Sequence, residues 1–256
     1  MSLSWRERVR CALTPQGVDM VRFGRGWKRR AEDRKSVPAS GAGWQPALDA
    51  LREMLAHPDI RAAEATVVLS ICFTRHLVLP WDPALRTERE FAAYAHARFA
   101  QIYGAAAEDC EIRLSGSGAG APRVAVAVER ALLEALHAAF AASALRLTSV
   151  QPRLMEIWNS SRAAIDGNAW ISIAEPGRLL LGLIQGRRWV TLRTRPLRGE
   201  VVALGDTLDQ ESLLLGIENH HKKAFVHEEG GVRFDAQDVD MRPLRALTVP
   251  PNGALA

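Results

Sequence analysis

Residues 73–103 read FTRHLVLPWDPALRTEREFAAYAHARFAQIY and carry the clearest fold signal in the chain. Apolar residues first form a short strand-like run, which ends at Pro80. Thr87 and Glu90 then have the spacing of a capping box, in which the threonine hydroxyl accepts one free helical N–H and the glutamate carboxylate accepts another. Apolar side chains recur at helical intervals through the rest of the segment. The segment therefore predicts a strand, a turn and an amphipathic helix that begins at Glu88.

Strand and helix patterns alternate on both sides of this segment. A hairpin near the N-terminus has its turn at Thr14-Pro15-Gln16-Gly17, and a basic linker with Pro38, Gly41 and Gly43 is expected after the hairpin. The other expected elements are hairpin strands over 9–13 and 18–23, a helix over 46–57, one or two strands within 65–79, strands over 110–114, 123–128 and 145–150, and helices over 129–142 and 152–165. This order of strands and helices indicates a layered α/β domain.

Asp166-Gly167-Asn168 is the strongest candidate for a domain boundary. Beyond it, three short apolar runs joined by tight turns predict an antiparallel meander. The expected elements are strands over 170–173, 179–184 and 189–193, a helix over 207–217, and strands over 224–227, 232–234 and 244–249. The chain is therefore expected to have a larger first lobe over 1–165 and a smaller second lobe over 166–256.

The composition is that of a folded globular protein, because hydrophobic residues make up 48% and charged residues 24% of the 256 residues. No apolar run reaches the roughly 20 residues needed to cross a bilayer, and the first ten residues lack the apolar core of a secretory signal. A cytoplasmic protein is expected. Its three cysteines, Cys11, Cys72 and Cys110, are expected to be buried free thiols rather than disulfide partners, because their number is odd and each lies in or beside an apolar run.

The net charge of +4 is concentrated in two basic groups. The first contains Arg22, Arg25, Lys28, Arg29, Arg30, Arg34 and Lys35, and the second contains Arg187, Arg188, Arg193, Arg195 and Arg198. Both are explained either as solvated surface or as sites that attract anionic headgroups or an acidic partner. Nucleic acid is not an expected ligand, because no helix-turn-helix or zinc pattern accompanies these groups.

The chain has no convincing catalytic or metal-binding motif. The glycine-rich segment 115–120 lacks the Gly-Lys-Ser/Thr ending of a phosphate loop and precedes a predicted strand, which favours a connection between strands. One group with the right atoms for a metal site consists of His220, His221, His227, Glu228 and Glu229. Its spacing matches no metal-binding motif, and lysines 222 and 223 would place positive charges beside a cation. No Gly-x-Ser-x-Gly elbow occurs. The residues alone therefore predict no metal, no cofactor and no active site.

The Leu79-Pro80-Trp81 strand end, with Arg75 before it and the helix over 88–103 after it, resembles a known family. This family comprises the cytoplasmic actin-like proteins of pilus and secretion machines, which include PilM of type IV pili, the MSHA-pilus protein MshI and the cytoplasmic part of the type II secretion protein GspL. The resemblance implies a two-lobed actin-like (ribonuclease-H-like) ATPase fold. It also implies that the first lobe carries an inserted subdomain, and that Trp81 packs structurally at its strand end.

In actin-like ATPases, each lobe opens with a hairpin whose turn supplies an aspartate for magnesium and N–H groups for the phosphates. The first corresponding turn here, with Thr14, Gln16 and Gly17, has no acid and contains a proline. The second turn, with Glu175 and Gly177, also contains a proline. Glu175 is an open alternative for the missing aspartate. The resemblance therefore implies degenerate phosphate turns and no catalysis, with binding of ATP and Mg²⁺ as the alternative.

The family implies a non-catalytic cytoplasmic scaffold at the inner face of the inner membrane. Such a scaffold would link an inner-membrane partner of a type IV pilus, an MSHA-like pilus or a type II secretion platform to the motor ATPase. Membrane association would be peripheral and would run through that partner, with Arg25, Lys28, Arg29 and Arg30 near the partner or the headgroups. The alternative is a nucleotide-binding ATPase of the same machinery, and a homodimer is left open.

Overall fold

The computed structural model of the chain describes residues 7–24, 31–116, 120–165, 167–217 and 222–244. Contacts between backbone positions divide the chain into two compact units. Within the described residues, the first unit comprises 7–74 and Val128–Glu156, and the second comprises Arg75–Ala127 and 157–244. The lobe boundary expected at residues 165 and 166 stays a prediction.

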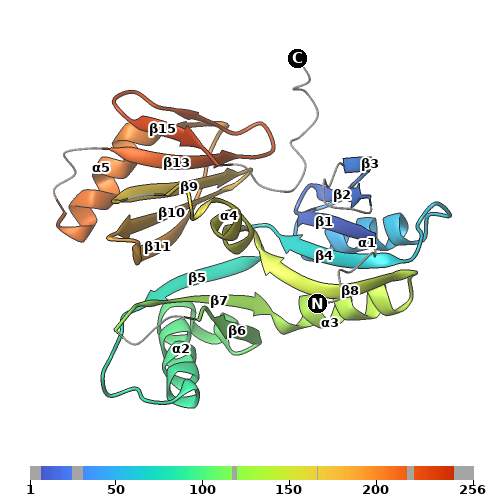
Figure 1. Cartoon of the computed structure of the whole chain (residues 1–256), viewed down its shortest axis with the longest axis horizontal. Coiled ribbons are helices and arrows are strands. Elements are labelled where there is room, and N and C mark those ends of the chain that lie inside the picture. Colours follow the sequence, from blue (N-terminus) through green and yellow to red (C-terminus); the bar gives the residue numbers. More distant parts are fainter. Residues whose placement is uncertain (1–6, 25–30, 117–119, 166, 218–221, 245–256) are drawn as a thin grey trace. The chain divides into compact units, whose positions relative to one another are not determined.

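The first unit is built on a five-stranded sheet of order β3-β2-β1-β4-β8 (Figure 1). Its strands are β1 (Arg8–Thr14), β2 (Gly17–Phe23), β3 (Ala31–Pro38), β4 (Ala63–Leu69) and β8 (Leu145–Pro152). β2 pairs antiparallel with β1 and β3, whereas β4 pairs parallel with β1 and β8. The predicted N-terminal hairpin is confirmed.

Helices α1 (Trp44–Leu55) and α3 (Arg130–Ala141) contact one another and strands of this sheet. Alternate β1 residues Val9, Cys11 and Leu13 are buried on one face of the strand, and Ala12 and Thr14 are buried on the other. Burial raises the pKa of the Cys11 thiol to about 12, so this cysteine is a neutral core residue at physiological pH. Helix α4 (Arg153–Ser161) follows β8 directly.

The second unit includes most of a three-stranded sheet of order β5-β7-β6. The elements of this part are β5 (Thr74–Leu79), β6 (Cys110–Leu114), β7 (Arg123–Glu129), α2 (Glu88–Tyr103) and the 3₁₀ helix η1 (Gly104–Ala107). The predicted capping box is confirmed, because Thr87 Oγ1 accepts from Glu90 N at 3.2 Å and Glu90 Oε2 accepts from Thr87 N at 2.8 Å. Phe99 of α2 is buried in the apolar cluster that this helix forms with the sheet.

A second five-stranded sheet has the order β11-β10-β9-β13-β15 (Figure 1). Its strands are β9 (Ala169–Glu175), β10 (Arg178–Gln185), β11 (Arg188–Pro196), β13 (Lys223–Glu228) and β15 (Asp240–Pro243). The antiparallel β9-β10-β11 meander confirms the prediction, and β13 pairs parallel with β9 and β15. Two short strands, β12 (Val201–Ala203) and β14 (Arg233–Asp235), form a separate parallel pair.

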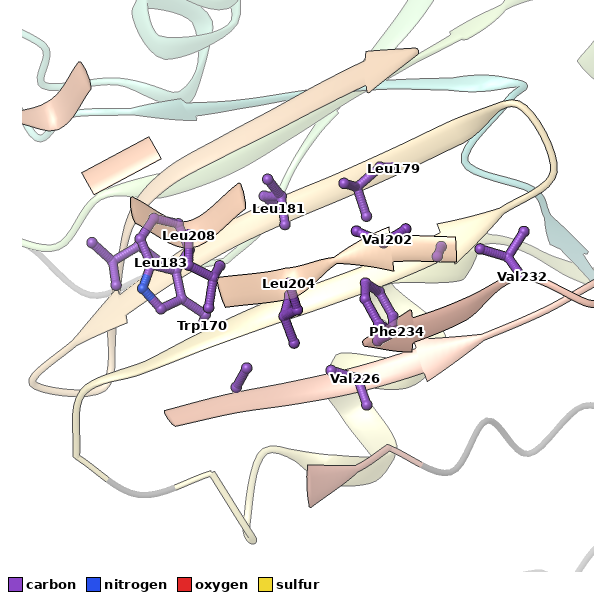
Figure 2. Packing of buried hydrophobic residues seen from close by; sticks show 12 residues of the cluster. Trp170, Leu179, Leu181, Leu183, Val202, Leu204, Leu208, Val226, Val232 and Phe234 are labelled. Carbon is purple, nitrogen blue, oxygen red and sulfur yellow. The ribbon is translucent and has the colours of Figure 1, made fainter. Parts of the chain in front are cut away.

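Helix α5 (Leu204–Leu215) and the β12-β14 pair bury one face of this second sheet. Figure 2 shows Leu204 and Leu208 of α5 packed with Leu181 of β10 and Trp170 of β9. Leu179, Leu181 and Leu183 all belong to this cluster because alternate residues of β10 face the same side. The even-numbered positions of β10 therefore face the opposite side of the sheet.

Some predictions made from the sequence were wrong in detail. Residues 31–38 form edge strand β3 rather than part of a linker, because pairing with β2 holds a charged segment in extended form. Trp81 is 44% exposed and does not pack as expected, whereas Leu79, at 1% exposed, ends β5 in the core. β12 was missed, and α4 ends at Ser161 instead of 165. The strand expected over 244–249 lies almost wholly outside the described residues.

The cysteine prediction holds for two of the three residues. Cys11 and Cys110 are buried free thiols, and Cys72 is a partly exposed one. The glycine-rich segment does connect two neighbouring strands, because Ser115 N donates to Val124 O at 2.8 Å and Val124 N donates to Ser115 Oγ at 2.9 Å. Residues 117–119 of that segment lie outside the described part of the chain.

Candidate functional site

The first candidate phosphate turn joins β1 to β2. Thr14 is opposite Gly17 in the ladder, so only Pro15 and Gln16 lie between the strands. Since Pro15 has no N–H, Gln16 supplies the backbone donor between the two strands. The Thr14 hydroxyl is buried and donates to the Gly17 carbonyl oxygen at 3.3 Å. The Thr14 hydroxyl at this turn is therefore neutral and already hydrogen-bonded within the hairpin.

The end of β3 explains why residue 17 is glycine. The φ angle of Gly17 is 146°, and an added Cβ would lie under 3.0 Å from the Val37 carbonyl oxygen, a separation that Cβ atoms essentially never show. Ala39 N also donates to the Gln16 carbonyl oxygen at 2.8 Å. Close approach of the β3 backbone therefore requires glycine at this position whether or not a ligand is bound.

The second candidate turn joins β9 to β10. Glu175 is opposite Arg178, which leaves Pro176 and Gly177 between the strands. Proline followed by a glycine with φ of 82° matches the two central positions of a type II turn. The Gly177 carbonyl oxygen accepts from Leu197 N at 3.0 Å, which ties the turn to the segment after β11.

Neighbouring residues also pack closely against the second turn. An added Cβ on Gly230 would lie under 3.0 Å from Cγ of Pro176, so the proline ring packs directly on this glycine. Glu229 N donates to the Ala174 carbonyl oxygen at 3.0 Å. Glu175 is 2% exposed, so its carboxylate lies within the second unit rather than projecting from the turn. Loss of phosphate binding at both turns stays a prediction, which this packing supports.

The candidate metal group is only partly described, because His220 and His221 lie outside the described residues. In the described ranges, no three His, Cys, Asp or Glu side chains gather as metal ligands would. Glu228 Oε1 instead accepts from Phe234 N at 2.6 Å, and His227 Nε2 lies 3.5 Å from Glu229 Oε2. The first contact joins β13 to β14, and the second joins β13 to the residue that follows it.

A hollow of about 280 Å³ opens on the first unit. Its lining residues come mainly from β1, β4 and β8: Arg8, Val9, Arg10, Phe23, Glu64, Thr66 and Thr148. The parallel register places Arg8 beside Glu64 and Arg10 beside Thr66. Arg146 Nη2 bonds Glu64 Oε1 at 2.8 Å, and Arg10 Nη1 bonds Glu156 Oε1 at 3.1 Å, so these two lining charges are already paired.

A buried charge cluster that the sequence patterns did not single out lies next to this hollow. Arg153 and Glu156, one helical turn apart on α4, each have side chains 1% exposed. Glu156 Oε1 lies 3.1 Å from Arg10 Nη1, and Glu156 Oε2 lies 3.6 Å from Arg153 Nη1. The i, i+3 spacing was the only sequence signal for this pair. Arg10 thus connects the buried cluster to the hollow.

The structure describes the two basic groups of the sequence to different extents. Arg25, Lys28, Arg29 and Arg30, the residues expected near a partner or membrane surface, lie outside the described residues. The second group surrounds β11. Within it, Arg193 and Arg195 both pair with Glu211 of α5, an acid that the sequence patterns did not single out.

The mixed five-stranded sheet of each unit, the hairpin that opens it and the helices that cover it define an α/β protein of the actin-like class. Solved structures place the chain in that class. The cytoplasmic domain of EpsL, an inner-membrane component of the type II secretion system of Vibrio cholerae, matches with a TM-score of 0.59 and 13% identity over 93% of this chain and 88% of that one. The PilM–PilN type IV pilus biogenesis complex matches with a TM-score of 0.62 and 13% identity over 92% and 87%.

A protein of unknown function with an actin-like ATPase fold from Bacteroides thetaiotaomicron also matches, with a TM-score of 0.60 and 9% identity over 87% of this chain and 82% of that one. The predicted actin-like fold is therefore confirmed. No family model matches the chain, and no curated protein matches it significantly. In the part of the chain that the structure describes, no helix is long and apolar enough to cross a membrane.

Proposed function

We propose that this chain is a non-catalytic cytoplasmic scaffold in the assembly platform of a type IV pilus, an MSHA-like pilus or a type II secretion system. Its fold is shared with the EpsL cytoplasmic domain and with the PilM–PilN complex, whose names refer to these two kinds of machine. By this likeness, the chain would hold the cytoplasmic part of an inner-membrane protein and link it to the motor ATPase. It would lie at the inner face of the inner membrane through that partner.

The observation that carries the non-catalytic part of the proposal is the chemistry of the two hairpin turns. Each turn contains a proline, Pro15 or Pro176, at a position where an N–H could otherwise face a phosphate. The first turn has no carboxylate, and the one beside the second, Glu175, is buried. An ATPase needs donors for the phosphates and an acid for Mg²⁺, and neither turn supplies this combination.

Titration calorimetry with ATP and Mg²⁺, together with a phosphate-release assay, tests this part. We expect neither binding heat nor phosphate release, while an actin-like ATPase that retains both turn aspartates serves as the positive control. Micromolar binding of ATP would contradict the scaffold-only reading and would favour a nucleotide-binding ATPase of the same machinery.

Co-expression tests the partner. The chain is expressed with each inner-membrane platform protein from the same genome, and complexes are isolated by size-exclusion chromatography. We expect a stable complex with one such protein, in a ratio that also shows whether the chain is a homodimer. If none of these proteins forms a complex, the scaffold role is wrong.

A further inference from the structure

β11 is a long and open sheet edge. It has nine residues, more than any other described strand, and it ends the strand order of the second sheet (Figure 1). Within the described ranges, no strand pairs with its outer side. The opposite edge, β15, has four residues and ends at Pro243. A long open edge presents a row of backbone groups that a further strand can bind.

The hairpin geometry shows which backbone groups of β11 face outward. Glu175 and Arg178 flank a two-residue turn, so they exchange hydrogen bonds, and the next β10 residue, Leu179, directs its N–H and C=O toward β11. Its partner on β11 is Arg195. The groups of Arg195 therefore face β10.

The same alternation shows in which direction the other backbone groups of β11 point. Arg193, two residues before Arg195, also faces β10, where it is opposite Leu181. The N–H and C=O of Leu192 and Thr194 consequently point away from the sheet. Pro196 falls in this outward phase, where its missing N–H breaks no ladder bond.

The charge on this edge selects the kind of strand that can bind. Residues 186–198 contain five arginines and no acid. Arg193 and Arg195 lie on the α5 side of the sheet, opposite Leu181 and Leu179, and share the single carboxylate of Glu211 at 3.2 and 3.7 Å. Their side chains remain 47% and 39% exposed. A second copy of β11 would bring further arginines to this edge and be repelled, whereas an acidic strand would be attracted.

An exposed apolar residue lies beside the charged edge. Leu214 of α5 is 66% exposed and follows Glu211 by three residues, which places it on the helix face that carries Glu211 toward the β11 arginines. Leu213 is 83% exposed, but it follows Glu211 by two residues and so projects from a different face. Leu214 therefore shares the α5 face that meets the β11 arginines, and Leu213 does not.

We propose that β11 binds an extended acidic segment of a partner protein. The segment pairs with the outward backbone groups of Leu192 and Thr194, places carboxylates near Arg193 and Arg195, and seats an apolar side chain against Leu214. This inference rests on the proposed function, because it names the surface through which the scaffold would hold its partner.

The probes are overlapping peptides of about 15 residues, long enough to cover a nine-residue strand, drawn from the cytoplasmic segments of the inner-membrane platform proteins of the same genome. Fluorescence anisotropy with the whole chain measures their affinity. We expect an acidic peptide to bind, and its affinity to fall as salt is raised. Amide exchange followed by NMR should then slow at Leu192 and Thr194 on binding, while Arg193 and Arg195 are protected with and without the peptide.

Two substitutions test the edge, and a third is the matched control. Thr194→Pro removes an outward N–H without removing a bond to β10, and Leu214→Glu places a carboxylate where the apolar side chain would sit. Each should weaken binding about tenfold or more. Leu213→Glu makes the same chemical change on a neighbouring exposed leucine and should leave affinity unchanged. Circular dichroism verifies that each variant folds. If Thr194→Pro does not fold, Leu214→Glu by itself still tests the proposal.

The outcomes separate the inference from the proposed function. Peptide binding without protection of Leu192 and Thr194, equal effects of Leu213→Glu and Leu214→Glu, or binding of basic peptides only would overturn the inference and leave the scaffold role standing. Protection of these amides by a second copy of the chain would also overturn it. If no platform peptide binds and no platform protein forms a complex, the proposed function fails and the inference fails with it.

Discussion

Replacing Gly17 by alanine should destabilise the first unit, because both the backbone conformation and the space at this position exclude a side chain. A residue forced into a glycine-type conformation costs about 1–3 kcal/mol, and the lower entropy of the unfolded alanine chain favours folding and offsets roughly 0.4–1 kcal/mol of that cost. The new Cβ must also displace the Val37 carbonyl, and loss of the Ala39–Gln16 hydrogen bond costs about 1 kcal/mol more. We expect a total loss of about 2–3 kcal/mol.

Urea unfolding followed by circular dichroism measures this loss. Gly43→Ala in the same unit is the matched control, because Gly43 has φ of 93° but its nearest neighbour is the flexible end of Gln45 at 3.4 Å. It should therefore cost about 1–2 kcal/mol from backbone strain alone. If Gly17→Ala is no more destabilising than Gly43→Ala, β3 does not crowd the first turn and the packing explanation for its glycine is wrong.

Three further predictions concern the second unit. Gly182→Ala would place a Cβ 2.6 Å from the Trp189 ring, so we expect a loss of about 1–3 kcal/mol and a changed tryptophan fluorescence spectrum; an unchanged spectrum would contradict this contact. Burial lowers the pKa of His76 from 6.5 to about 3, so the unfolded chain binds a proton in this range that the folded chain does not. Stability should fall as the pH drops from 6.5 toward 3, by up to about 1.4 kcal/mol per pH unit, and urea titrations of His76→Leu should show a shallower slope. Thr87→Ala removes the acceptor for Glu90 N and should cost about 1 kcal/mol in thermal unfolding, whereas Thr87→Ser should retain most of that stability.

Local signals explain why much of the fold could be predicted. The capping box of Thr87 and Glu90 acts within one turn of α2, and the turns at Pro15 and Pro176 act within single hairpins. Such features depend on neighbours in the chain, so the sequence contains all their parts. Strand β3 could not be found in the same way, because its charged residues become a strand only by pairing with β2. The exposure of Trp81 was missed for a similar reason, since burial depends on the surrounding packing.

The sequence by itself determined the α/β order, the antiparallel meander and the absence of an acid from the first hairpin turn. These properties follow from residue type and short-range spacing. Only the tertiary structure decided that β3 requires glycine at 17, that Glu211 meets Arg193 and Arg195, and that β11 is an open edge. Each of these brings together groups that the chain separates, and sheet pairing and helix packing set their distances. The candidate partner surface on β11 is therefore a product of register and packing rather than of a sequence motif.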